Sequence, residues 1–110
     1  MITINPVSEV DAVLSVPGSK SLTQRALIAA ALSSGVSTLH GPLASEDTAL
    51  MTKALQNLGI DIDSSNPEAW TVQGTGGRLH APAVPLYLGN NGTATRFLTS
   101  VAALAHGTIH

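Results

Sequence analysis

Apolar residues recur at helical spacing in three segments of the chain. The first, residues 20–32, is rich in Ala and Leu, and its polar residues crowd into the first turns. Ser19 is a suitable N-cap and Gly35 a suitable stop. We therefore predict a helix whose body is buried and whose N-terminal end alone meets solvent or a ligand.

Two further helices are predicted. The second runs from about Ser45 to Gly59, because five apolar residues share one face: Leu50, Met51, Ala54, Leu55 and Leu58. Four polar residues on the other face are expected to meet water: Thr52, Lys53, Gln56 and Asn57. The third helix starts around Gly92 and continues through Leu104.

Short runs of β-favouring residues predict the strands. They comprise residues 36–39, 60–63, 70–73 and 86–88, with a last fragment after Gly107. The second and third runs alternate between apolar and polar residues, so we expect them to pair across the turn region at 64–67. Before the first helix, residues 1–7 and 12–16 look like extended pieces that end at a bend at Pro17–Gly18. The resulting fold class is α/β (α+β).

Composition narrows the classes of protein to consider. Of the 110 residues, 44% are hydrophobic and 11% charged, which excludes a disordered acidic tail and a polybasic nucleic-acid binder and predicts a packed core. No long apolar run or secretion signal is visible, so we expect no membrane partner and a soluble, cytoplasmic protein. Cysteine is absent and the four histidines are scattered, so no metal site is expected.

An internal repeat relates the first and third helices. Placing Arg25 on Arg96 gives an offset of 71 residues, and Ala30–Gly35 falls on Ala102–Gly107 at an offset of 72 after one inserted residue. Both copies comprise a turn rich in small polar residues, an Arg in the first turns, an Ala/Leu helix and a Gly. A repeat unit normally needs neighbours to bury its faces, so we interpret the chain as part of a larger array.

The start of the first helix has the composition of an anion site. Lys20, Ser21 and Arg25 place two cations and a hydroxyl where free backbone N–H groups and the helix dipole already favour an anion. Ser21 and Arg25 lie four residues apart and can grip one oxyanion. The alternative is that Lys20 and Arg25 are ordinary solvated surface residues. This alternative is weakened because cations at this end of a helix oppose its dipole.

The Gly-rich segment 88–96 repeats this combination of small polar residues and a cation at the start of the third helix. Its bare backbone permits close approach of a ligand, although plain turn geometry also explains the glycines. Two converging helix N-termini would form one anion-attracting crevice, with Arg25 and Asn91 facing a common ligand that carries several negative groups. Glu46 and Asp47 are most simply first-turn acids of the second helix; a role in positioning the Gly-rich turn is the alternative.

Residues 16–21 with Arg25, together with residues 88–96, resemble the two N-terminal signatures of the 5-enolpyruvylshikimate-3-phosphate synthase family. The similarity runs over essentially all 110 residues. Ser21 stands where the sibling UDP-N-acetylglucosamine enolpyruvyl transferases typically have Asn. The resemblance implies transfer of the enolpyruvyl group of phosphoenolpyruvate to the 5-hydroxyl of shikimate 3-phosphate, with release of phosphate through a tetrahedral intermediate and without a metal or organic cofactor.

The resemblance also implies roles for individual residues. Ser21 and Arg25 would hold shikimate 3-phosphate, and Lys20, the expected catalytic residue, would touch both substrates. Asn90 and Gly92 would line the phosphoenolpyruvate pocket. Both substrates are multiply anionic, as the cationic helix starts require.

Three further residues are expected to support the Gly-rich loop: Thr93, Arg96 and Glu46. Two positions depart from the family pattern. Phe97 follows Arg96 where many members have Pro, and Glu46 stands where Asp is common. Phe97 can tilt the third helix and alter the tolerance of phosphoenolpyruvate mimics such as glyphosate.

Members of the family are several times longer and fold as two domains, each built from βαβαββ units in an inverted α/β barrel. The chain resembles the first unit and the opening of the second. Residues 1–17 would be a strand segment of the other domain and residues 18–110 a partial substrate-binding domain. The acid/base carboxylates of the family lie beyond residue 110, so the missing C-terminal part is an expected partner and this fragment alone is expected to be inactive.

Two other functions stay open at this point. A small non-catalytic anion-binding module would use the same helix starts. A nucleotide-binding protein is disfavoured, because a P-loop requires Gly-x-x-x-x-Gly-Lys-Ser/Thr, whereas Lys20 follows Ser19 and Val13 stands five residues before Gly18.

Overall fold

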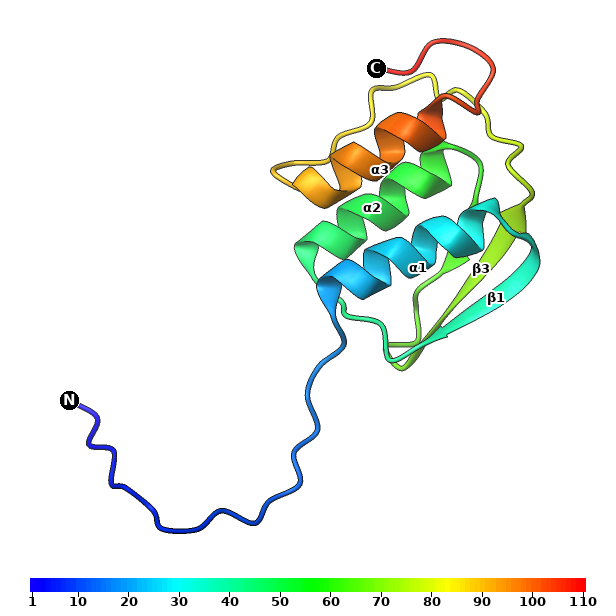
Figure 1. Ribbon diagram of the computed structural model, residues 1–110. Coiled ribbons are helices and arrows are strands. Elements are labelled where there is room, and N and C mark those ends of the chain that lie inside the picture. Colours follow the sequence, from blue (N-terminus) through cyan, green and yellow to red (C-terminus); the bar gives the residue numbers. More distant parts are fainter.

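The three predicted helices form, and each begins at a side-chain cap. The computed structural model describes all 110 residues (Figure 1). Its helices are α1 (Lys20–Leu32), α2 (Glu46–Asn57) and α3 (Gly92–Ala102). The side chains of the N-caps accept hydrogen bonds from backbone N–H groups three residues on: Ser19 from Leu22, Ser45 from Thr48 and Asn91 from Ala94. These local contacts explain why the helix starts were predictable.

The helix ends are less regular than the sequence suggested. α1 stops at Leu32 because Ser33 adopts an extended backbone conformation, with a ψ of 166°, and Gly35 already lies in the following strand. α3 ends at Ala102, two residues before Leu104. α2 ends close to the predicted point, and Gly59 after it adopts a φ of +95° that favours glycine.

The helices cover one face of a three-stranded antiparallel sheet. Its strands are β1 (Ser34–His40), β2 (Asp61–Asp63) and β3 (Ala69–Thr75), in the order β1-β3-β2. On β3, Trp70 and Val72 are buried, while Thr71 and Gln73 on the opposite face are exposed. The pairing of β2 with β3 confirms the predicted hairpin, and the α/β (α+β) fold class is also confirmed.

The predicted strands at 86–88 and after Gly107 do not form, so these two predictions are wrong. The two segments share only one backbone bond, in which the Leu86 N–H donates to the His110 carbonyl at 2.7 Å. Just before them, His80 and His106 form one isolated parallel bridge. Residues 1–17 form no helix or strand and extend away from the body of the molecule (Figure 1). They add no strand to the sheet, and their assignment to another domain stays a prediction.

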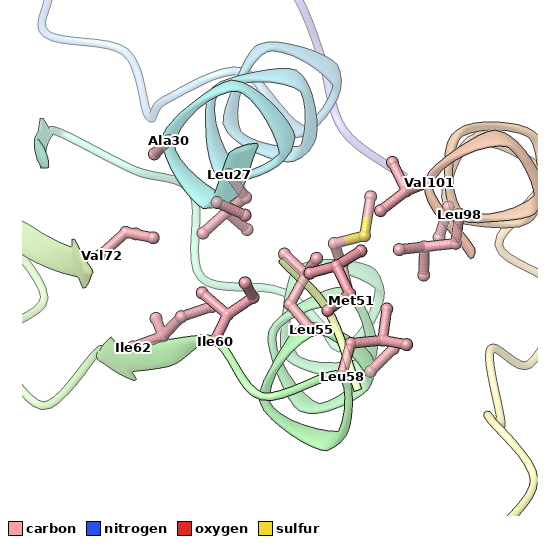
Figure 2. Close-up of a cluster of buried hydrophobic side chains, with 14 of the residues drawn as sticks. Leu27, Ala30, Met51, Leu55, Leu58, Ile60, Ile62, Val72, Leu98 and Val101 are labelled. Atoms are coloured by element: carbon pink, nitrogen blue, oxygen red, sulfur yellow. The ribbon is translucent and has the colours of Figure 1, made fainter. Parts of the chain in front are cut away.

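One hydrophobic core joins the helices to the sheet. Figure 2 shows Leu27, Leu55, Ile62 and Leu98 pointing into a common space between α1, α2, α3 and the strands. All four are at most 5% exposed. None of the helices has the length and apolar character that crossing a bilayer requires.

Two burial predictions are wrong. Thr52 was expected to face water, yet it is buried. It lines the same small hollow as Trp70 of β3. The body of α1 from Ala26 onward was expected to be buried all round, but Ala26 and Ala29 are exposed. Helical periodicity identifies apolar residues but not which neighbours cover them.

Candidate functional site

The N-terminal ends of the three helices lie at the same end of the molecule (Figure 1). Asp47, in the first turn of α2, connects them. Its carboxylate lies 2.6 Å from the Lys20 ammonium at the start of α1, and its backbone carbonyl accepts a 2.9 Å hydrogen bond from the Asn91 side chain, the N-cap of α3. The two anion-site motifs of the sequence therefore converge on one end of the helical layer.

A turn at residues 41–43 fixes the start of α1. The Thr23 hydroxyl accepts a 2.9 Å hydrogen bond from the Leu43 N–H, and it donates in turn to the Ser19 carbonyl at 2.9 Å. Gly18 packs so closely on this turn that an added Cβ would collide with the Gly41 carbonyl oxygen. The glycine that sequence patterns assign to a bend is thus needed for close backbone contact.

The Gly-rich turn packs against α2 and caps α3. Gly89 has a φ of +56°, and an added Cβ would lie 3.2 Å from Leu50 of α2. Asn91 is buried and uses its side-chain oxygen and nitrogen within the chain, whereas Asn90 is exposed. Nothing lies within 4 Å of a Cβ added at Gly92, so the start of α3 has an open face.

The cations of the site are only partly neutralised. Lys20–Asp47 is the one ion pair of the chain, and the side chains are 52% and 29% exposed. Arg25 and Arg96 are exposed in the second turns of α1 and α3 without an acidic partner. Two carboxylates, Glu46 and Asp47, stand against these three cations. Free N–H groups and helix dipoles add positive potential, so this end as a whole favours an anion.

A hollow of about 390 Å³ opens between α2 and the Gly-rich turn. It is lined by Glu46, Asp47, Leu50, Tyr87, Gly89 and Asn90. A larger groove of about 700 Å³ runs along α1 and β1, on a different part of the surface, and is lined mainly by small and apolar residues. The smaller hollow is the one that contains predicted site residues.

The structure brings some predicted residues together more directly than others. Glu46 and Asn90 line the same hollow, and Lys20 pairs with Asp47, which also lines it. Ser21 is half-buried and Thr93 likewise, and both lie on the first turns of their helices outside the lining. Arg25 and Arg96 stand one turn further along.

The sequence did not reveal the contacts that two residues make at this site. Asp47 was treated together with Glu46 as a first-turn acid. Asn91 was expected to face a common ligand with Arg25, whereas its side chain is buried, caps α3 and donates to the Asp47 carbonyl. Asn91 carried a usable signal, because Asn directly before a predicted helix is a preferred N-cap. No local signal distinguishes Asp47 from Glu46, since the choice depends on how α2 is rotated toward α1.

Comparison with known proteins gives a consistent picture. A family model described as EPSP synthase (3-phosphoshikimate 1-carboxyvinyltransferase) matches residues 4–110. A 3-phosphoshikimate 1-carboxyvinyltransferase of Rhizobium leguminosarum bv. trifolii is 53% identical over 93 residues, which are 84% of this chain and 22% of the relative. The protein of that name from Methanothermobacter thermautotrophicus is 44% identical over 104 residues, 94% of this chain and 24% of the relative.

A solved structure and one further relative in sequence agree with these matches. EPSP synthase from Acinetobacter baumannii matches with a TM-score of 0.75 and 34% identity, over 80% of this chain and 20% of that structure. The pentafunctional AROM polypeptide of Schizosaccharomyces pombe is 48% identical over 96 residues, 86% of this chain and 6% of the relative. The chain thus spans about a fifth to a quarter of the 3-phosphoshikimate 1-carboxyvinyltransferases it matches.

Proposed function

Because the chain belongs to the EPSP synthase family, we propose that it supplies the first part of the substrate site of a 3-phosphoshikimate 1-carboxyvinyltransferase. The single observation that carries the proposal is the convergence of three helix N-termini on Asp47, with Lys20 and Asn91 as its partners. Such an end favours a ligand with several negative groups, and both proposed substrates have them.

The proposed reaction joins the 5-oxygen of shikimate 3-phosphate to C2 of phosphoenolpyruvate. C3 of phosphoenolpyruvate gains a proton in this addition, and the 5-hydroxyl loses one. The C2–oxygen bond to phosphate then breaks and C3 loses a proton, which gives the enolpyruvyl ether and phosphate. The residues of this chain would hold the anionic groups, and the proton-transfer carboxylates would come from the longer protein.

We assign the roles as follows. Lys20 touches both substrates and stabilises charge near the reacting atoms, while Ser21 and Arg25, on one face of α1, hold shikimate 3-phosphate. Asn90 and Gly92 line the phosphoenolpyruvate pocket. The exposed Asn90 side chain and the open face at Gly92 support this assignment.

Three residues would support the loop. Glu46 lines the same hollow as Asn90, and Thr93 and Arg96 lie in the first two turns of α3. None of the three needs to contact substrate in this proposal.

Residues 1–17 would complete a sheet in the second domain of the longer protein. Their large hydrophobic side chains are 71–120% exposed here: Met1, Ile2, Ile4, Val7, Val10, Val13, Leu14 and Val16. An arm of this composition requires a partner surface to bury it.

We also propose that the parent protein is located in the cytoplasm, which cell fractionation tests.

The direct test is an assay of the longer protein that contains this chain. Incubation with shikimate 3-phosphate and phosphoenolpyruvate is expected to release phosphate and form the enolpyruvyl ether, detected by mass. UDP-N-acetylglucosamine in place of shikimate 3-phosphate serves as the control acceptor and should give no product. The isolated 110-residue chain is expected to show no turnover; absence of turnover by the longer protein would contradict the proposed function.

Gly92→Ala separates a ligand role from plain turn geometry. The added Cβ meets no atom within 4 Å, and Ala restricts the unfolded chain, so the stability should rise by about 0.5 kcal/mol. The methyl group would occupy the open face, so the KM for phosphoenolpyruvate should rise about tenfold, the cost of one misplaced contact of about 1.4 kcal/mol. Unchanged KM values in steady-state assays would assign Gly92 to turn geometry alone.

A further inference from the structure

Asp47 occupies the junction of the three helices and uses two different groups there. The carboxylate contacts Lys20 of α1, and the backbone carbonyl accepts from Asn91 of the Gly-rich turn. Glu46, its neighbour in the same first turn, is exposed and forms no ion pair. The two acids therefore differ in what they contact, although both complement the helix dipole.

The ion pair also determines where the Lys20 ammonium lies. Asp47 lines the hollow beside Gly89 and Asn90, and the Lys20 nitrogen is 2.6 Å from its carboxylate oxygen. The ammonium is thus held beside a residue that lines the hollow, although Lys20 itself is not part of the lining. A free Lys side chain has four rotatable bonds and would sample many other positions.

From these contacts we propose that Asp47 is a positioning residue, which aims the Lys20 ammonium at the hollow and holds the Gly-rich turn beside it. The inference rests on the proposed function, because its effect is on a reaction that uses Lys20. Asp47 acts through Lys20 and Asn91 and does not itself need to touch substrate.

Asp47→Asn in the longer protein tests the carboxylate alone, since the backbone carbonyl and its bond to Asn91 remain. We expect kcat to fall about tenfold or more, because a misplaced catalytic group is costly to the rate. The KM values of the anionic substrates should stay equal or fall, because loss of a nearby carboxylate makes the site more positive. The unfolding midpoint should hardly move, since partly exposed ion pairs contribute little to stability.

Asp61→Asn is the matched control. It makes the same chemical change at an exposed position of β2, outside the site, and should leave kcat and KM unchanged. Asp47→Glu keeps the charge but shifts it by one methylene, so its kcat should lie between those of the wild type and Asp47→Asn. This variant also serves as the test if Asp47→Asn does not fold.

A double-mutant cycle with Lys20→Met distinguishes positioning from general structural support. If Asp47 acts through Lys20, neither Asp47 substitution should lower kcat further in the Lys20→Met background. Multiplied losses in the double variants, or a kcat of Asp47→Asn within threefold of the wild type, would overturn the proposal. Lack of activity in the wild-type protein would instead count against the proposed function.

Discussion

Lys20→Met is expected to lower kcat of the longer protein by about 10²- to 10³-fold, the usual cost of removing one group that stabilises charge in a transition state. Lys20 is the only cation of the chain with an ion pair, and its partner Asp47 lines the hollow beside Asn90. The loss should appear in kcat and in kcat/KM, because the interaction strengthens as charge develops. Steady-state assays with both substrates measure it.

The stability of the Lys20→Met protein should change by less than about 1 kcal/mol, since the Lys20 side chain is 52% exposed and water screens its ion pair. Lys53→Met is the matched control, because Lys53 lies exposed in the middle of α2 and outside the site. It should retain wild-type activity. A Lys20→Met protein that keeps more than a third of the wild-type kcat would remove Lys20 from the proposed mechanism.

The parts of the fold that sequence predicted correctly depend on local contacts. Ser19, Ser45 and Asn91 cap helices through bonds to residues three positions away, so the signal lies within one turn of sequence. The alternation at 60–63 and 70–73 similarly places both strands across a short turn. These patterns are legible without knowledge of the tertiary structure.

The parts that sequence missed depend on distant neighbours. Thr52 is polar but buried, because the chain around Trp70 covers that side of α2. Residues 86–88 have β-favouring side chains but take part in only two backbone bonds, from the Leu86 N–H to the His110 carbonyl and from the Asn91 N–H to the Leu88 carbonyl. Propensity cannot supply a strand partner that the tertiary structure does not place beside it.

The candidate site likewise has a part that the sequence predicted and a part that depends on distant neighbours. The motifs around Lys20 and Asn90 follow from composition at helix starts, and the internal repeat suggested that they meet. The choice of Asp47 over Glu46 required the rotation of α2 relative to α1, which has no signature in the sequence. Gly18 was assigned to a bend, whereas its contact with the Gly41 carbonyl comes from a turn more than twenty residues away.

Gly74→Ala should destabilise the fold by about 3 kcal/mol, the upper part of the range for an atom forced into a filled space. Gly74 lies in β3 against the last turn of α1, and an added Cβ would stand 2.5 Å from the Ala30 carbonyl oxygen and closer still to that of Ser33. The Gly76 N–H donates to the same Ser33 carbonyl at 2.8 Å, so the strand cannot withdraw from the helix without losing a backbone bond.

Urea unfolding of the chain, followed by the fluorescence of its single Trp, measures this effect. Trp70 is 4% exposed in the core and lies on the same strand as Gly74, so its fluorescence reports the unfolding of that strand. A domain of this size has roughly 5–15 kcal/mol of stability, and a loss of about 3 kcal/mol moves the midpoint well outside error. Gly92→Ala is the control, because its Cβ meets open space and its midpoint should rise slightly. Equal midpoints for Gly74→Ala and the wild type would mean that α1 and β3 can separate freely, and the close contact that anchors the end of α1 would be wrong.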